Sequence, residues 1–160
     1  MSTRFSHDLI YDAPLADVDA MLMDQDFRER VCDAQGAIRK SVTITEDDDG
    51  VTVLVDQVQT AEGIPGFARK FVGDEINLVQ TESWFDAENA RVEVVIPGKP
   101  GEMTGTISLS ESGGVTTERL EMTIKVNIPL VGGKIENLIA DLLRAALKAE
   151  NAVGRDYLSG

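Results

Sequence analysis

The C-terminal part of the chain has the pattern of one long amphipathic helix. Between about Gly133 and Leu158, apolar residues recur with helical spacing. At ~100° per residue they cover about 180° of the helix circumference, whereas a helix packed on one side needs a stripe of roughly 100°. The stripe contains Ile135, Leu138, Ile139, Leu142, Leu143, Ala146, Leu147, Ala149, Val153 and Tyr157. The pattern therefore predicts that other elements cover this helix on two flanks.

The residues before this helix alternate between apolar and polar, which is typical of β-strands. A first strand is expected over Phe5–Tyr11, followed by two short helices between Pro14 and Gly36 and then by six strands, the last ending near Ile128. A short helical segment over Phe67–Val72 interrupts the strands. Tight turns such as Asp48-Asp49-Gly50 join successive strands and indicate antiparallel pairing.

This order of elements predicts an α+β fold in which a curved antiparallel sheet wraps around the C-terminal helix. With 160 residues and no linker or repeat, the chain is expected to form a single domain over residues 1–160. A sheet curved in this way tends to leave a cavity against the helix.

The same order resembles the helix-grip superfamily, also called START-like or SRPBCC, and within it an uncharacterised bacterial family of unknown function. The segments that carry the resemblance are Ala13-Pro14 to Leu22, Ile64-Pro65-Gly66-Phe67 to Gly73, and Ile128-Pro129-Leu130-Val131-Gly132-Gly133-Lys134-Ile135-Glu136. In one respect the chain departs from many members, because Phe27-Arg28-Glu29-Arg30 stands where they have an aromatic Pro-x-Trp stretch. The resemblance implies seven strands and a hydrophobic cavity that takes lipids, polyketides or other apolar molecules. It transfers no catalytic residue.

Charge and composition exclude several classes of partner. The formal net charge is −13 with only 15 basic residues, which argues against binding nucleic acid or an anionic membrane. No window approaches the roughly 18 apolar residues of a membrane-spanning helix, so stable membrane insertion is not expected. The N-terminal residues lack the apolar core of a secretory signal, and the single cysteine, Cys32, suits a reducing cytoplasm.

The sequence contains no motif for a nucleotide, a phosphate, a serine nucleophile or a histidine-ligated metal, so we expect no cofactor, no metal site and no assigned catalytic residue. His7 is the only histidine. It lies on the same strand face as Phe5 and Leu9, where it is either a packed strand residue or a lone general base. Cys32 is interpreted as a small apolar filler, with a Cys32–His7 nucleophile pair as the alternative.

Eight residues are candidates for contact with a ligand, because their spacing places them on the inner side of the sheet or helix. They are Phe67, Phe71, Trp84, Met103, Met122, Ile139, Leu143 and Glu150. Trp84, Met103 and Met122 suit either the core or a cavity wall. Phe67 and Phe71, four residues apart, either fill the core or form a flap over the mouth of the cavity.

Glu150 falls within the apolar stripe of the long helix, at about the angle of Ile139 and Leu143. Such a carboxylate is either solvated near the end of the chain, paired in a salt bridge, or placed in a polar pocket with a raised pKa. Four further polar residues are expected on the same strand faces as apolar residues, because they alternate with the same period of two: Gln57, Gln59, Gln80 and Glu82. They mark either the floor of a wet pocket or the place where the strands leave the core.

Three functions follow from these patterns. The leading hypothesis is non-catalytic binding of a hydrophobic or amphipathic small molecule between the sheet and the helix. The second is an enzyme of the cyclase or dehydratase kind that uses Glu150 or Glu82 as general acid or base. In the third, the extra apolar flank of the helix is an interface for a partner or a homodimer.

Overall fold

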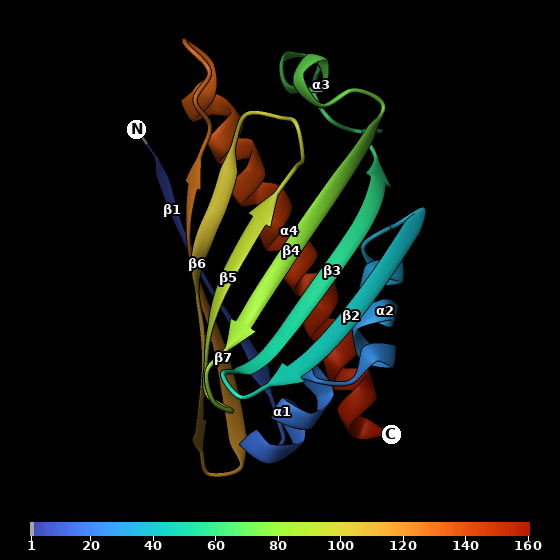
Figure 1. The fold of residues 1–160 in the computed structure, drawn as a ribbon, viewed down its shortest axis with the longest axis vertical. Coiled ribbons are helices and arrows are strands. Elements are labelled where there is room, and N and C mark those ends of the chain that lie inside the picture. The colour runs from blue at the N-terminus through green and yellow to red at the C-terminus, as the bar shows by residue number, and fades with distance from the viewer. Residues whose placement is uncertain (1) are drawn as a thin grey trace.

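The computed structural model describes residues 2–160 and has an α+β helix-grip fold (Figure 1). In chain order the elements are β1 (Thr3–Tyr11), α1 (Leu15–Leu22), α2 (Gln25–Ala34), β2 (Arg39–Asp47), β3 (Gly50–Thr60), α3 (Gly66–Val72), β4 (Glu75–Trp84), β5 (Asn89–Val95), β6 (Glu102–Ser112), β7 (Val115–Lys125) and α4 (Gly132–Ser159). The predicted fold class and element order are confirmed.

The seven strands form one antiparallel sheet in the order β1-β7-β6-β5-β4-β3-β2. Alternate residues of each strand point to the inner face of the sheet. The alternation of apolar and polar residues in the sequence therefore corresponds to a buried inner face and an exposed outer face. In the middle of β6, a Cβ atom on Gly105 would lie 1.8 Å from the backbone oxygen of Glu121 on β7. Only glycine fits this close approach between two strands of the curved sheet.

Helix α4 crosses the inner side of the sheet diagonally, with its first turn at the end of the molecule that carries α3 (Figure 1). It contacts β1 and β7 on the sheet and α1 and α2 beside it. Leu143 is half-buried and Leu147 is buried, as expected for a helix that is covered on two flanks. Leu142 is 46% exposed, so the covered stripe is narrower there than the sequence analysis expected.

The last strand is shorter than predicted, because β7 ends at Lys125 rather than near Ile128. The cause is a change of hydrogen-bond partner. The backbone N–H of Val126 donates to the carboxylate of Glu136 on α4 at 2.9 Å instead of to a neighbouring strand. The same carboxylate accepts a hydrogen bond from the hydroxyl of Thr3 on β1 at 2.8 Å. Glu136 therefore anchors the start of α4 to the sheet.

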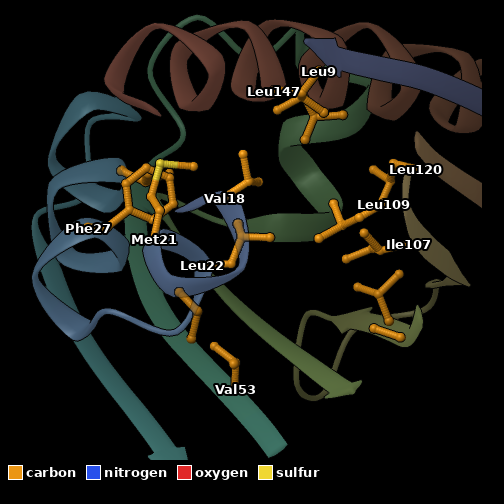
Figure 2. Close-up of a cluster of buried hydrophobic side chains, with 14 of the residues drawn as sticks. Leu9, Val18, Met21, Leu22, Phe27, Val53, Ile107, Leu109, Leu120 and Leu147 are labelled. Atoms are coloured by element: carbon orange, nitrogen blue, oxygen red, sulfur yellow. The ribbon is translucent and has the colours of Figure 1, made fainter. Parts of the chain in front are cut away.

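Helices α1 and α2 close the end of the sheet that lies opposite α3, and their apolar side chains enter the space under α4. Figure 2 shows Val18, Met21, Leu22 and Phe27 from these helices packed toward the sheet residues. All four are fully buried. The main core thus occupies much of the space in which a cavity was predicted from the sequence.

A second, smaller apolar cluster lies at the α3 end, built on Ala68, Val126 and Ile135. Phe67 and Phe71 of α3 pack against it half-buried, and the Lys134 ammonium sits 4.1 Å above the centre of the Phe67 ring. This end of the interior is less completely covered than the end closed by α1 and α2.

Candidate functional site

A small cavity lies between α2, α4 and the inner face of strands β3 and β4. Its volume is about 20 Å³, which is room for about one water molecule. The lining residues are Arg28, Val31, Cys32, Gln35, Val55, Gln57, Gln80 and Glu150. The cavity is smaller and more polar than the apolar space predicted from the sequence, because side chains of α1 and α2 are buried in the core under α4.

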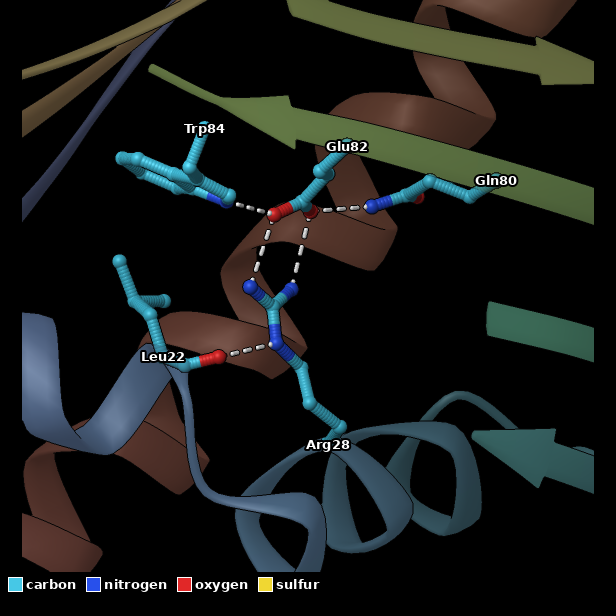
Figure 3. A network of polar contacts seen from close by, with 5 residues as sticks. All are labelled: Leu22, Arg28, Gln80, Glu82 and Trp84. Atoms are coloured by element: carbon cyan, nitrogen blue, oxygen red, sulfur yellow. Dashed lines mark hydrogen bonds and ion pairs between the residues drawn. The ribbon is translucent and has the colours of Figure 1, made fainter. Parts of the chain in front are cut away.

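The strongest polar contact beside this cavity joins Arg28 of α2 to Glu82 of β4 (Figure 3). The two guanidinium NH₂ groups donate to the two carboxylate oxygens at 2.9 and 2.8 Å, and Nε donates to the backbone carbonyl of Leu22 at 2.8 Å. Glu82 also accepts hydrogen bonds from Gln80 at 2.6 Å and from the Trp84 indole at 2.9 Å. The pair is fully buried and every oxygen of Glu82 is used.

Local sequence explains why Arg28 points inward. Asp24 caps α2 by accepting a hydrogen bond from the backbone N–H of Asp26 at 2.9 Å, which sets the first turn of the helix. Arg28 is then three and four residues before Val31 and Cys32, so all three lie on one face. This face packs toward the sheet, and its residues are buried.

Glu150 is 9% exposed and lines the cavity, so the alternative of a solvated side chain near the end of the chain is wrong. The salt-bridge alternative is also wrong for the residues that the structure describes, because the guanidinium of Arg28 is bonded to Glu82. Burial raises the pKa of Glu150 to about 7, and Arg28 opposes this rise. The carboxyl group therefore holds its proton to a higher pH than an exposed glutamate does.

Two buried groups near Glu150 were missed from the sequence, Glu118 of β7 and Tyr11 of β1. Burial, followed by the charges of Glu150 and Glu82, raises the pKa of Glu118 well above its ordinary value. Burial, followed by the charges of Glu150 and Glu118, raises the pKa of Tyr11. One Glu118 oxygen and the Tyr11 hydroxyl find no hydrogen-bond partner within residues 2–160. Both residues had a usable signal, since each shares the parity of apolar neighbours in its strand.

The glutamines form a chain of hydrogen bonds along the inner face of β3. Gln59 donates to Gln57 at 3.0 Å, Gln57 donates to Gln35 at 3.1 Å, and Gln35 donates to the backbone carbonyl of Ala146 at 3.0 Å. Gln57 and Gln80 line the cavity. Of the two alternatives from the sequence, the polar floor of a pocket describes these residues.

The other predicted ligand residues divide into two groups. Trp84 and Met122 are buried in the main core. The rest are half-buried, namely Phe67, Phe71, Met103, Ile139 and Leu143. Ile139 packs against both apolar clusters and so connects the α3 end with the main core. Of the eight predicted residues, Glu150 alone lines the small cavity; contact of the other seven with a ligand stays a prediction.

His7 and Cys32 do not come together at this cavity. Cys32 lines it, and burial raises the pKa of its thiol to about 11. His7 lies half-buried on β1, stacked on Phe5, where burial and the charge of Arg144 lower its pKa. Within residues 2–160, no group of three or more histidine, cysteine or acidic side chains is arranged to hold a metal ion. In the same part of the chain, no helix is both long and apolar enough to cross a bilayer.

Residues 6–158 match a family described as "Protein of unknown function (DUF2505)". Among curated relatives, uncharacterized protein Rv0481c of Mycobacterium tuberculosis is 30% identical over 111 residues, which are 65% of this chain and 63% of that protein. The matched stretch thus spans less than two thirds of the length of this relative.

Three solved structures show the same fold at low sequence identity. TTHA0849 of Thermus thermophilus has a TM-score of 0.68, 17% identity and 99% coverage of both chains. The Zhui aromatase/cyclase of Streptomyces sp. R1128 has a TM-score of 0.61, 11% identity and coverage of 98% of this chain and 90% of that one. Norcoclaurine synthase of Thalictrum flavum, solved with dopamine and hydroxybenzaldehyde, has a TM-score of 0.65, 15% identity and coverage of 98% and 88%. At these identities the likeness establishes the helix-grip fold.

Proposed function

This chain belongs to the DUF2505 family of proteins of unknown function, and from its helix-grip fold we propose that it binds an amphipathic small molecule between the curved sheet and α4. Proteins of similar fold include one solved with small aromatic molecules and one named as an aromatase/cyclase. The proposal for this chain rests on its own interior, whose lining changes from apolar to polar along both α4 and β4.

One observation carries the proposal: α4 and β4 both change from apolar to polar in the same direction. The inner face of α4 passes from half-buried Ile139 and Leu143 to the carboxyl group of Glu150 over ~16 Å, at 1.5 Å per residue. The inner face of β4 passes from half-buried Ile76 and Leu78 to Gln80 and Glu82. Both elements start at the α3 end (Figure 1), so the two polar parts lie toward the same end.

This arrangement suits a molecule with an apolar body and a polar head. The body would lie at the α3 end, against half-buried side chains that gain apolar burial when they are covered. The head would reach the cavity lined by Gln57, Gln80 and Glu150, where groups able to form hydrogen bonds fix its orientation. Because the cavity is only about 20 Å³, side chains at the α3 end must move to admit the body.

Fluorescence of N-phenyl-1-naphthylamine, a probe that brightens in apolar sites, tests the proposal. We expect saturable binding with one site per chain. The substitution Leu143→Trp adds bulk to the proposed site and should weaken binding at least tenfold. Leu142→Trp, on the adjacent exposed position of the same helix, is the matched control and should leave binding unchanged. Absence of saturable binding, or equal effects of the two substitutions, would refute the proposal.

A second candidate function is acid/base catalysis by Glu150, favoured by its position at a cavity and by its pKa of about 7. A general base is most effective when its pKa lies near the working pH. Base-promoted ring opening of 5-nitrobenzisoxazole is a general probe of such a carboxylate. Catalysis that follows an apparent pKa near 7 and disappears in Glu150→Gln supports this function; a rate equal to that of Glu150→Gln at every pH excludes it for this class of substrate.

A further inference from the structure

We infer that the polar head of the ligand is a primary ammonium group, bound by the Glu150 carboxylate in the small cavity. The inference rests on the proposed function and adds the chemical class of the ligand. Its basis is an excess of buried carboxyl groups over cations near the cavity, together with the Glu150 carboxylate, which lines the cavity and has no ion-pair partner within residues 2–160.

Among the buried side chains near the cavity, carboxyl groups outnumber cations. Three glutamates from three elements, Glu82 of β4, Glu118 of β7 and Glu150 of α4, are each at most 9% exposed and lie close enough for their charges to influence one another; Glu150 is the one of the three that lines the cavity. Within residues 2–160 the one buried cation near them is Arg28 of α2, and its guanidinium is bonded to both oxygens of Glu82. Tyr11 of β1 completes the titratable groups on this side and stays neutral, because burial raises its pKa.

Glu118 and Glu150 thus feel the charge of Arg28 but form no ion pair of their own within residues 2–160. An isolated buried carboxylate is costly, so such groups take up a proton or are paired with a cation. Glu118 is enclosed and one of its oxygens has no hydrogen-bond partner within residues 2–160, which favours its protonated form. Glu150 differs because it lines the cavity, where a ligand can reach it.

The cavity fits an ammonium group in size and in the groups that line it. Its volume of about 20 Å³ holds one group of the size of water, and –NH₃⁺ is of that size. An ammonium group has three donors and no acceptor, and it needs acceptors around it. The Glu150 carboxylate supplies one, and the side chains of Gln35, Gln57 and Gln80, each with an amide oxygen that has two lone pairs, belong to residues that line the same cavity. Arg28 also lines the cavity, with its two NH₂ groups bonded to Glu82, and a carboxylate or phosphate head would lie beside the Glu150 carboxylate, which repels it.

Three ligands with the same apolar chain test the inference by displacing N-phenyl-1-naphthylamine: 1-octylamine, 1-octanol and octanoate. At pH 8 we expect the amine to bind at least tenfold more tightly than the alcohol, and octanoate to bind most weakly. Equal affinity of the amine and the alcohol, or tighter binding of octanoate, would overturn the inference and leave the proposed function standing. If the naphthylamine probe does not bind at all, the proposed function itself fails.

The pH dependence gives an independent readout on the unmodified protein. Octylamine keeps its proton throughout, as a lysine side chain does. Between pH 6 and 8, the ionised fraction of a group with a pKa of about 7 rises from about one tenth to about nine tenths, so amine affinity should rise about tenfold while octanol affinity stays constant. Calorimetry in buffers of different ionisation enthalpy should show about half a proton released per amine bound at pH 7. A flat pH profile without proton release contradicts the inference.

Two isosteric variants separate binding from folding. Glu150→Gln removes the charge at the cavity and should abolish the preference for amine over alcohol. Glu118→Gln imitates the protonated form of an equally buried glutamate and should keep amine affinity within twofold. Equal loss of preference in both variants, with octanol binding retained, would show that the ammonium does not pair with Glu150.

Discussion

Removal of Arg28 should destabilise the protein strongly, because it leaves a carboxylate buried without its countercharge. The side chains of Arg28 and Glu82 are only 4% and 3% exposed, and they share two charge-assisted hydrogen bonds of 2.9 and 2.8 Å. Breaking a buried pair of this kind costs about 3–5 kcal/mol. For a chain of this size about 2–4 °C are lost per kcal/mol, so Arg28→Met should lower Tm by roughly 6–20 °C.

Urea unfolding followed by circular dichroism measures this cost, and the structure offers a close control. Arg119 and Asp8 also share two hydrogen bonds, from Nε and one NH₂ group at 2.8 and 2.9 Å, but their side chains are 54% and 36% exposed. Arg119→Met should therefore cost less than about 1 kcal/mol. The double variant Arg28→Met/Glu82→Gln should be more stable than Arg28→Met alone, since the unpaired charge is gone. If Arg28→Met and Arg119→Met cost the same, the assignment of a buried ion pair at the site is wrong.

Three further predictions concern the surroundings of the cavity. Burial raises the pKa of Glu150 from 4.5 to about 7, so the stability that its protonated form contributes is complete below pH 4.5 and is lost as pH rises through 7. At pH 8, thermal unfolding should therefore show Glu150→Gln to be more stable than wild type, by up to about 3 kcal/mol. A less stable variant at pH 8 contradicts this prediction. Gly154→Ala places Cβ 2.5 Å from the Tyr11 ring and should lower the free energy of unfolding in urea by about 1–3 kcal/mol. Gly133→Ala is the control, because its Cβ meets no atom within 4 Å, and it should leave the free energy of unfolding unchanged. Equal effects of the two substitutions would show that Tyr11 does not pack against α4. The Cys32 thiol, buried and with its pKa raised to about 11, should react with Ellman's reagent at pH 8 at least a hundredfold more slowly than in urea, and rapid reaction of the folded protein would show that the cavity is open.

The sequence was sufficient for the fold because its signals are long and regular. The helical period of α4 extends over 28 residues, and the alternation of each strand fixes which side chains face inward. Residues that break such a pattern are found in the same way: Glu150 falls at an apolar angle of the helix and Glu82 at an apolar parity of its strand. Glu118 has the same signal, two residues before Leu120.

The character of the cavity depended on contacts that no local pattern contains. Arg28 and Glu82 are 54 residues apart, and their pairing requires that α2 pack against β2 and α4 so that the Arg28 side chain reaches the inner face of β4. That docking also brings Phe27 into the interior and leaves only about 20 Å³ beside Glu150. A helical wheel gives the direction of Glu150 but not what packs opposite to it, so its buried state and raised pKa required the structure.

The hypothesis that an apolar flank of α4 forms an interface for a partner or a homodimer can also be tested. Leu142 on α4 is 46% exposed, and Leu130, in the loop before α4, is fully exposed. A homodimer that uses this flank of α4 would cover Leu142. Light scattering after size exclusion should show a monomer for Leu142→Asp and a dimer for the unmodified chain if the hypothesis holds; a monomer in both cases excludes it.

The most direct test of small-molecule binding between sheet and helix is an NMR experiment that detects contacts between a bound ligand and methyl groups of the protein. With 1-octanol bound to protein labelled at its methyl groups, we expect nuclear Overhauser effects from the alkyl chain to Met103, Ile139 and Leu143. Contacts confined to Leu142 and Leu130, on the exposed flank and loop, would contradict the account and place the ligand outside the fold.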